Sequence, residues 1–503
     1  MRKFVLLVLV ALLTFSSKAQ LDNKIVIGKI DSVYSNILHE PRKIWIYTPD
    51  MTSGDRDPGK RYPVLYLLDG DAHFPSVTGL VQQLSQSNGN TVLPEMIIVG
   101  IPNTDRTRDL TPTHVTSDPP MLDSVFSKSS GGGENFLAFI EKELMPHVET
   151  LYPAAPYKVL VGHSFGGLTV MNALANHANL FNAYVAIDPS MWYDRERFLS
   201  AVEKKLTEKN YQGIRLYVGI ANTMPEGMTL AQLKKDTTSD TRHIRSIFAL
   251  DKFIRTNVQN GLTYTSRYYK EDSHGSVPLA SEYDGLRFIF DYYRMNLTAK
   301  DFSDSTDAFV KKLKNHYEWV SKKMGYKVSP PELLINAMGY DAMSKQQYKK
   351  AAAVFQMNIE NYPNSNNVYD SYGDLLAAQK DTLRAIASYQ KALTIKDYAY
   401  TRQKLNVLEG KEGFKLSARE LQKYAGVFNM DSVAVTITLR VKEDALWAEV
   451  PGEGLFQLVP FSRDTFTVKN MSGYEVHFHT DGDSVLGFTS VQPNGTFKAH
   501  VKK

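Results

Sequence analysis

The stretch YKVLVGHSFGGLTVMNALANH, residues 157–177, decides the fold of the first half of the chain. Tyr157–Val161 is a short apolar run typical of a buried strand, and the residues after Gly167 have the pattern of a helix. Between them, residues 162–166 match G-x-S-x-G, the turn that carries a nucleophilic serine. The glycines allow the strained backbone that lifts the serine hydroxyl above the edge of a sheet. Ser164 is therefore a candidate nucleophile, and a structural glycine–serine turn is the alternative.

Strand and helix patterns alternate on both sides of this stretch. Segment 42–49 alternates with period two, and further apolar runs that end in turn residues lie at 62–70, 95–103, 183–190 and 214–222. Helical patterns separate the runs, among them residues 135–152 and 282–295. Such alternation is typical of a mostly parallel sheet covered on both faces. We expect an α/β domain over residues 20–298.

A repeat marks the next segment, where helical periodicity dominates residues 306–410. Gly339 and Gly373 are 34 residues apart, and so are Phe355 and Tyr389. This spacing is the period of tetratricopeptide repeats, in which small residues let two helices pack closely. We expect an all-α tetratricopeptide-like segment whose role is packing or contact with a protein partner. An ordinary helical bundle is the alternative.

The last segment, residues 416–503, reads as a small antiparallel β domain. Its short alternating runs are separated by Gly, Pro, Asn and Asp, which predicts a barrel or a sandwich. The stretches LQKYAGVFNM (421–430) and LVPFSRDTF (458–466) resemble a β domain often appended to serine hydrolases and penicillin-recognising enzymes. That resemblance implies no catalytic role for this domain.

The N-terminus predicts export. Residues 1–19 combine a basic start, an apolar run at 4–15 that is too short to span a bilayer, and small residues before position 20. We read them as a signal peptide, with an uncleaved anchor as the alternative. The chain has no cysteine, which excludes a thiol nucleophile, a thiolate metal site and disulfides. We expect a periplasmic or secreted bacterial protein.

Charge argues against two classes of partner. Residues 1–19 hold three basic residues and no acidic one, so the remainder has 55 basic and 54 acidic residues. This balance gives no electrostatic reason to expect nucleic acid or an anionic membrane as a partner. His477 and His479 share one face of a strand-like segment, but without a third ligand nearby they predict no metal site.

A serine nucleophile needs a base, and the base needs an acid that orients it. In α/β-hydrolases the order along the chain is Ser, acid, His. His274 lies in a Ser/Gly loop after the strand-like segment 262–269 and is the expected base. His177 lies on the helix that follows Ser164, and His243 lies in a helical stretch, so both are less suitable.

The acid is less well defined by the sequence. Glu226 lies just past the run 214–222 and is the favoured residue. Asp188, directly after the run 183–187, and Asp240, further along, are alternatives. A different acid, or a Ser–His dyad without one, also stays open.

Four further residues complete the expected site. The backbone N–H groups of Phe165, next to the nucleophile, and of Asp71, after the turn Asp69-Gly70, are the expected donors of an oxyanion hole. Trp192 and Arg108 are candidates for substrate binding. For Trp192 the alternative is plain packing, and for Arg108 it is a buried structural pair with an aspartate.

Together these residues resemble the esterase D-like branch of the α/β-hydrolases. The likeness is carried by RKIWIYTP, YPVLYLLDG, RTRDLTPTH, VGHSFGG, AIDPSMWY and SHGSVP. This branch includes enterochelin-type siderophore esterases, feruloyl esterases and mycolyltransferases. The loop VGIANTMPEG is similar to the mycolyltransferase loop that holds the catalytic glutamate, which supports Glu226.

The resemblance implies a secreted serine hydrolase that cleaves carboxylic esters through a Ser-His-acid triad and an acyl-enzyme, without a cofactor. Siderophores, acylated carbohydrates and small acyl esters all fit as substrates. Many siderophore and feruloyl esterases have an aromatic residue shortly after the catalytic histidine, where this chain has SHGSVPLA. The alternatives are an acyltransferase and a non-catalytic binding or assembly protein that uses the repeats and the β domain.

Overall fold

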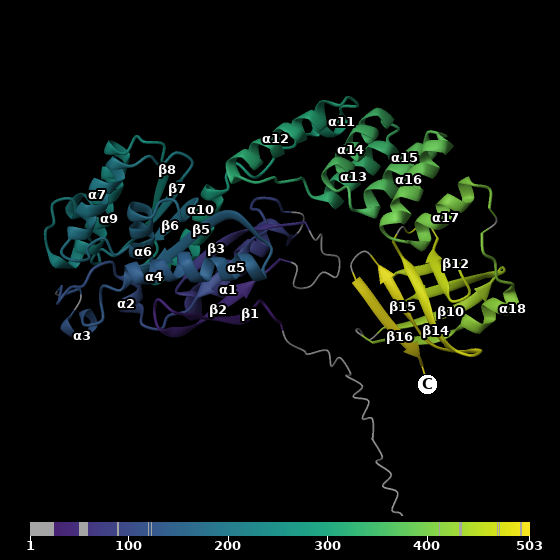
Figure 1. Ribbon diagram of the computed structural model, residues 1–503, viewed down its shortest axis with the longest axis horizontal. Helices are drawn as coiled ribbons and strands as arrows, with labels where there is room; N and C mark the ends of the chain where they lie inside the picture. The colour runs from purple at the N-terminus through teal and green to yellow at the C-terminus, as the bar shows by residue number, and fades with distance from the viewer. Residues whose placement is uncertain are drawn as a thin grey trace, which may run out of the picture. The chain divides into compact units, whose positions relative to one another are not determined.

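A computed structural model describes residues 25–49, 59–87, 90–118, 120–121, 123–411, 413–431, 435–469, 471, 473–492 and 495–502. The predicted signal peptide, residues 1–19, lies outside the described residues. The chain divides into two units, Ile27–Glu412 and one that contains Gly413–Lys503 (Figure 1). Among the helices described, none is long and apolar enough to cross a bilayer.

The first unit is built on an eight-stranded sheet in the order β1-β2-β4-β3-β5-β6-β7-β8. β1 and β2 pair antiparallel, β2 also pairs antiparallel with β4, and the strands from β4 to β8 are parallel. The sheet confirms the mostly parallel arrangement expected from the sequence. Its strands are β1 (Lys29–Ser35), β2 (Glu40–Tyr47), β3 (Tyr62–Leu68), β4 (Ile97–Ile101), β5 (Ala154–His163), β6 (Ala183–Ile187), β7 (Arg215–Ala221) and β8 (Thr263–Tyr269).

Helices cover both faces of this sheet, as Figure 1 shows. One face carries α1 (Gly70–Ser85) and α10 (Val277–Ile289), which contact each other. The other face carries most of the remaining helices, and short helices lie in the connections. These are α2 (Arg106–Leu110), α3 (Ser124–Ser127), α4 (Gly133–Phe139), η2 (Ile140–Leu144), α5 (Met145–Leu151), α6 (Phe165–Asn176), α7 (Arg197–Glu208), α8 (Leu230–Leu233), η3 (Ser239–Thr241) and α9 (Arg242–Asn257).

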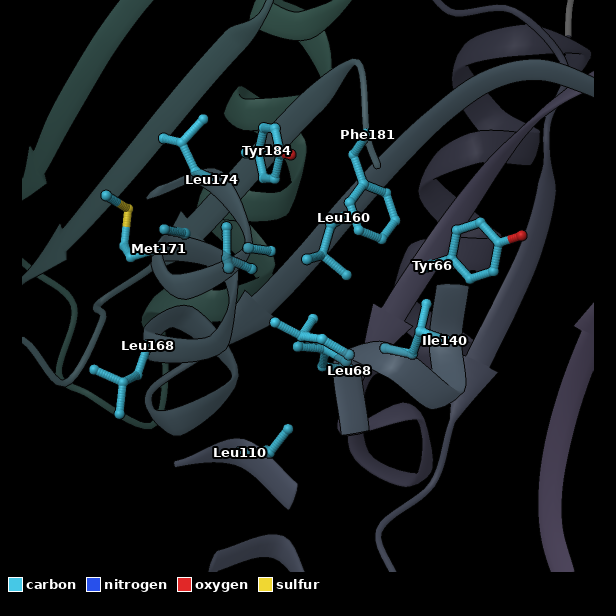
Figure 2. Packing of buried hydrophobic residues seen from close by; sticks show 14 of the residues in the cluster. Tyr66, Leu68, Leu110, Ile140, Leu160, Leu168, Met171, Leu174, Phe181 and Tyr184 are labelled. Atoms are coloured by element: carbon cyan, nitrogen blue, oxygen red, sulfur yellow. The ribbon is translucent and has the colours of Figure 1, made fainter. Parts of the chain in front are cut away.

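The core therefore has two layers, one on each side of the sheet. In β3 the residues alternate between them: Tyr66 and Leu68 belong to one layer, and Leu65 and Leu67 to the other. Figure 2 shows the first layer, where Leu168, Met171 and Leu174 of α6 lie with Leu160 and Tyr184 of the sheet. Since α6 is almost wholly buried, the turn that carries Ser164 stands on a rigid base.

The helical segment continues the first unit with α11 (Ala299–Ser303), α12 (Ala308–Met324), α13 (Glu332–Ser344), α14 (Tyr348–Asn361), α15 (Asn366–Ala378), α16 (Thr382–Ile395) and α17 (Ala399–Leu408). Two helix pairs repeat the same contact. A Cβ on Gly339 would lie 2.4 Å from the Phe355 ring, and one on Gly373 would lie 2.5 Å from the Tyr389 ring. The two glycines, which lie 34 residues apart, thus each pack against an aromatic ring of the following helix, and the two rings are also 34 residues apart.

The second unit contains a closed barrel of β9 to β16, which settles the choice between barrel and sandwich. The barrel closes where β9 pairs antiparallel with both β10 and β16. Tyr424 and four phenylalanines contribute to its buried core. Its elements are α18 (Ala418–Leu421), η4 (Gln422–Tyr424), β9 (Gly426–Met430), β10 (Thr436–Lys442), β11 (Ala445–Val450), β12 (Gly454–Pro460), β13 (Thr465–Val468), β14 (Glu475–Asp481), β15 (Ser484–Gln492) and β16 (Gly495–Val501).

Because Gly373 packs tightly against the Tyr389 ring, adding a single methyl group at residue 373 should destabilise the fold. Gly373→Ala places a methyl group against a buried ring and should destabilise the α15–α16 pair by about 1–3 kcal/mol. Hydrogen exchange of peptides from α15 and α16 should become faster. The matched control is Gly79→Ala in α1, where a Cβ meets nothing within 4 Å. At that position the higher helix propensity of alanine should stabilise the folded protein by up to about 1 kcal/mol. Unchanged exchange in Gly373→Ala would contradict this packing.

Candidate active site

Ser164 lies at a sharp turn between the end of β5 and the start of α6. Its backbone has φ 59° and ψ −114°, a strained conformation for a residue with a side chain. The turn is tied to the next strand: the Ser164 N–H donates to the carbonyl of Ile187 at 2.9 Å, and the Ser190 N–H donates to the Ser164 carbonyl at 3.2 Å. The Ser164 hydroxyl also lies 3.5 Å from that of Ser190.

Glycines around Ser164 are required by close backbone contacts. A Cβ on Gly162 would lie 2.5 Å from the Gly166 carbonyl group, and one on Gly167 would lie 2.9 Å from Cα of Pro189. Neither contact can be relieved by moving a flexible side chain. Gly162 and Gly167 thus let β5, α6 and the turn after β6 approach one another.

Asp188 follows β6 directly and is fully buried. Its backbone also has a positive φ of 41°. One carboxylate oxygen, Oδ1, accepts the N–H of Ala221 at 2.9 Å. The other, Oδ2, faces two imidazoles: His274 Nδ1 at 2.6 Å and His243 Nε2 at 2.8 Å. Burial by itself would raise the pKa of Asp188, but the hydrogen bonds from the two imidazoles outweigh it and hold the pKa well below its usual range.

His274 lies in the loop between β8 and α10, with 41% of its side chain exposed. Because an ionised carboxylate only accepts hydrogen bonds, the His274 Nδ1 that faces Asp188 carries the hydrogen. In the neutral imidazole, the other nitrogen, Nε2, then carries the lone pair. The His274 ring packs against that of His163, with centroids 4.5 Å apart and the planes tilted by 42°, and His163 is the residue before Ser164. The exposed imidazole thus stands beside the Ser164 turn.

The structure gives His274 a different carboxylate from the one that the sequence favours. Glu226 lies on an exposed turn after β7, whereas the hydrogen bond to His274 comes from Asp188, the alternative. Asp240 is exposed in η3. The physical reason lies in the left-handed turn at Asp188, which keeps its carboxylate in the interior next to the loop after β8. An aspartate directly after a fully buried strand, followed by proline, was the available signal.

The two residues expected to form an oxyanion hole lie in the first turns of neighbouring helices. Phe165 begins α6, and Asp71 is the second residue of α1. The two helix starts abut, since a Cβ on Gly166 would lie 3.1 Å from the Asp69 carboxylate. Backbone N–H groups in the first turn of a helix have no partner within the helix. The helix starts therefore bring two such donor groups to the same edge of the sheet.

Arg106, in the same short helix as Arg108, contacts the residues on either side of Ser164. Its guanidinium donates to both oxygens of Asp69 and to the His163 carbonyl, and lies 5.4 Å over the Phe165 ring. Arg108 instead donates to Glu40 and Asp109, and these carboxylates raise its pKa. Arg108 thus has the contacts of the structural alternative. The motif RTRDL alone could not rank the two arginines.

Trp192 lies near the candidate nucleophile but is largely covered. It is 5% exposed, and its ring centroid is 6.0 Å from that of Phe165. Its carbonyl accepts a hydrogen bond from Arg242, which also makes two hydrogen bonds to Asp118. These contacts hold the buried Trp192 in place, with its ring packed against Phe165.

Three imidazoles, those of His274, His163 and His73, contact one another in sequence. The His163 ring lies between His274 and His73, and His73 is paired with the buried carboxylate of Glu282 at 3.1 Å. Burial would lower the pKa of His73, but the bond to Glu282 raises it. Burial and the two neighbouring imidazoles lower the pKa of His163 to about 3. His163 is therefore a neutral ring packed against His274.

One group among the described residues has the composition of a metal site. The ligating atoms of Asp188, His243 and His274 all lie within 4.8 Å of one another. Their contacts of 2.6 and 2.8 Å are hydrogen-bond lengths, shorter than the roughly 3.3 Å between ligands of a tetrahedral zinc ion. As arranged here, both imidazoles are hydrogen-bonded to the Asp188 carboxylate.

Comparisons with known proteins agree with this geometry. The family model described as "Putative esterase" matches residues 35–252. An IroE-like serine hydrolase from Shewanella oneidensis has the same fold, with a TM-score of 0.55 and 29% identity, covering 66% of this chain and 99% of that one. These matches confirm the predicted resemblance to an esterase branch of the α/β-hydrolases.

Two curated relatives are esterases by name, one of them a siderophore esterase. Ferri-bacillibactin esterase BesA of Bacillus subtilis is 32% identical over 170 residues, which is 32% of this chain and 59% of BesA. Siderophore enterobactin esterase of Emericella nidulans is 31% identical over 163 residues, which is 30% of this chain and 54% of that relative. The chain thus spans little more than half the length of the curated relatives it matches.

The pKa of His163 predicts how stability responds to acid. His163 is neutral in the folded protein down to about pH 3, whereas its ordinary value is 6.5. Between these values the unfolded chain binds the additional proton, so the free energy of unfolding falls as the pH drops from 6.5 towards 3. Urea unfolding at several pH values should show that the free energy of unfolding falls less with acid in His163→Leu than in the wild type. Equal losses in the two proteins would contradict a neutral buried His163.

Proposed function

We propose that the protein is a serine hydrolase that cleaves carboxylic esters with Ser164, His274 and Asp188. The observation that carries the proposal is the hydrogen bond from the exposed imidazole of His274 to the buried Asp188 carboxylate, beside the strained turn of Ser164. A partly exposed imidazole held by a buried anion next to a strained serine is the arrangement that activates a serine. The esterase matches support the same reaction class.

The reaction follows from these positions. Ser164 Oγ attacks the acyl carbon of the ester while His274 Nε2 takes its proton, and Asp188 stabilises the imidazolium through the Nδ1–H bond. The tetrahedral intermediate collapses, His274 returns the proton to the departing alkoxide, and an alcohol leaves. Water then attacks the acyl-enzyme with His274 again as the base. The carboxylic acid is released, and Ser164 regains its proton.

The developing oxyanion would be stabilised by backbone donors at the two abutting helix starts. The N–H groups of Phe165 and Asp71 belong to the first turns of α6 and α1, where the helix dipole also favours negative charge. Each such donor typically contributes about 3–4 kcal/mol to the stabilisation of a transition state. Both are main-chain groups, so neither side chain has to take part.

Among the substrate classes that fit, we favour an ester of the siderophore type over an acylated carbohydrate. Of the curated relatives, one is named a siderophore enterobactin esterase and one a ferri-bacillibactin esterase, which supports this choice. The predicted signal peptide supports a reaction in the periplasm or outside a bacterial cell. The helical segment and the barrel are proposed to contact a partner rather than to carry out the reaction.

Loss of the nucleophile or the base should abolish ester hydrolysis. Ser164→Ala and His274→Ala should each lower kcat/KM at least about 10³-fold on p-nitrophenyl acetate, because the residues act as a unit. Enterobactin and acetylated xylan, tested under the same conditions, distinguish the two substrate classes. A wild type that is inert on all three substrates and is not labelled at Ser164 by a fluorophosphonate would contradict the proposed function.

The identity of the acid can be tested separately. Asp188→Asn should lower kcat about 10²- to 10⁴-fold, because the amide no longer fixes the His274 tautomer. Glu226→Gln is the control, and since Glu226 lies on an exposed turn its activity should stay within about two-fold of the wild type. Steady-state kinetics of both variants show which of the two carboxylates the reaction depends on. The reverse order of losses would restore Glu226 as the acid.

A further inference from the structure

The Asp188 carboxylate has a second imidazole partner that the proposed mechanism leaves without a role. His243 Nε2 lies 2.8 Å from the same oxygen, Oδ2, that His274 contacts. The His243 side chain is 10% exposed, whereas that of His274 is 41% exposed. The difference in exposure separates the two imidazoles, since only His274 is open to a substrate.

His243 is held firmly at the start of α9, which packs against α7 and β7 (Figure 1). The residue before it, Arg242, makes two hydrogen bonds to Asp118 and one to the Trp192 carbonyl. The Ser246 hydroxyl donates to the His243 carbonyl. These contacts fix the first turn of α9, so the His243 imidazole approaches Asp188 from a set direction.

The hydrogen-bond roles follow from the charge of Asp188. The ionised carboxylate only accepts, so His243 carries its hydrogen on Nε2 and donates it to Oδ2. The His243 and His274 rings meet edge to face, with centroids 5.1 Å apart and an angle of 89°. His243 therefore fixes the carboxylate oxygen and also borders the ring of His274.

A buried anion needs every available donor. Asp188 is removed from water, and its donors are Ala221 N–H on Oδ1 and the two imidazoles on Oδ2. Without His243, Oδ2 would keep His274, on the loop after β8, as its imidazole donor, and the space beside that ring would open. The carboxylate could then rotate and turn His274 away from the Ser164 turn.

We propose that His243 is a positioning residue: it fixes Asp188 Oδ2, and through it the imidazole of His274, in the orientation that the reaction requires. The proposal rests on the proposed function, in which His274 is the base. His243 does not touch the substrate, so its contribution belongs to kcat rather than to substrate binding.

The test compares three variants in the full chain on p-nitrophenyl acetate. His243→Phe keeps a ring but loses the N–H donor, and it should lower kcat about 10- to 100-fold with KM within about two-fold of the wild type. His243→Gln keeps an N–H donor at a similar distance and should recover most of the lost rate. His177→Phe is the matched control, because His177 pairs with Glu134 at an exposed position and should behave as the wild type.

Proton NMR keeps the proposal testable if His243→Phe fails to fold. In the wild type, the N–H protons of His243 and His274 that face Asp188 should both resonate at low field, and Asp188→Asn should shift both. A full kcat in folded His243→Phe, an equal loss in His243→Gln, or a low-field signal from His274 alone would overturn the positioning role. Failure of the proposed function is distinguishable, because then the wild type itself would not depend on Ser164.

Discussion

The arrangement around Ser164 depends on one buried charge, the carboxylate of Asp188. A carboxylate without water is strongly unfavourable unless hydrogen-bond donors surround it. Its donors come from three separate places: the end of β7 through Ala221, the first turn of α9 through His243, and the loop after β8 through His274. Satisfying this charge therefore joins three elements that lie far apart in the sequence.

Backbone strain is concentrated at the same place. Ser164 and Asp188 both have positive φ values, at the ends of the neighbouring strands β5 and β6. Strain of this kind costs about 1–3 kcal/mol per residue and persists where the surroundings enforce it. Here the backbone bonds of Ser164 with Ile187 and Ser190 hold the two turns together, and the buried α6 supports them. The candidate nucleophile and the buried acid thus belong to one rigid unit.

The strands, the Ser164 turn and the position of His274 could be predicted, because each depends on residues that are close together in the sequence. The apolar runs gave the strands, the G-x-S-x-G motif gave the turn of Ser164, and the loop after the last strand gave His274. The acid stays a prediction, because several carboxylates follow strand ends and the sequence does not show that the backbone turn at Asp188 directs its side chain inward, toward His274. His243 was set aside as helical, since the sequence does not show that its helix begins next to Asp188. Closure of the barrel likewise depends on β9 meeting β16, a pairing between distant residues.

The most direct measurement is a crystal structure of the full chain with Ser164 phosphonylated by an aryl phosphonate. The account predicts that one phosphonyl oxygen accepts the N–H groups of Phe165 and Asp71, while His274 Nδ1 keeps its hydrogen bond to Asp188. A phosphonate on a different residue, or His274 bonded to Glu226 in the adduct, would contradict it.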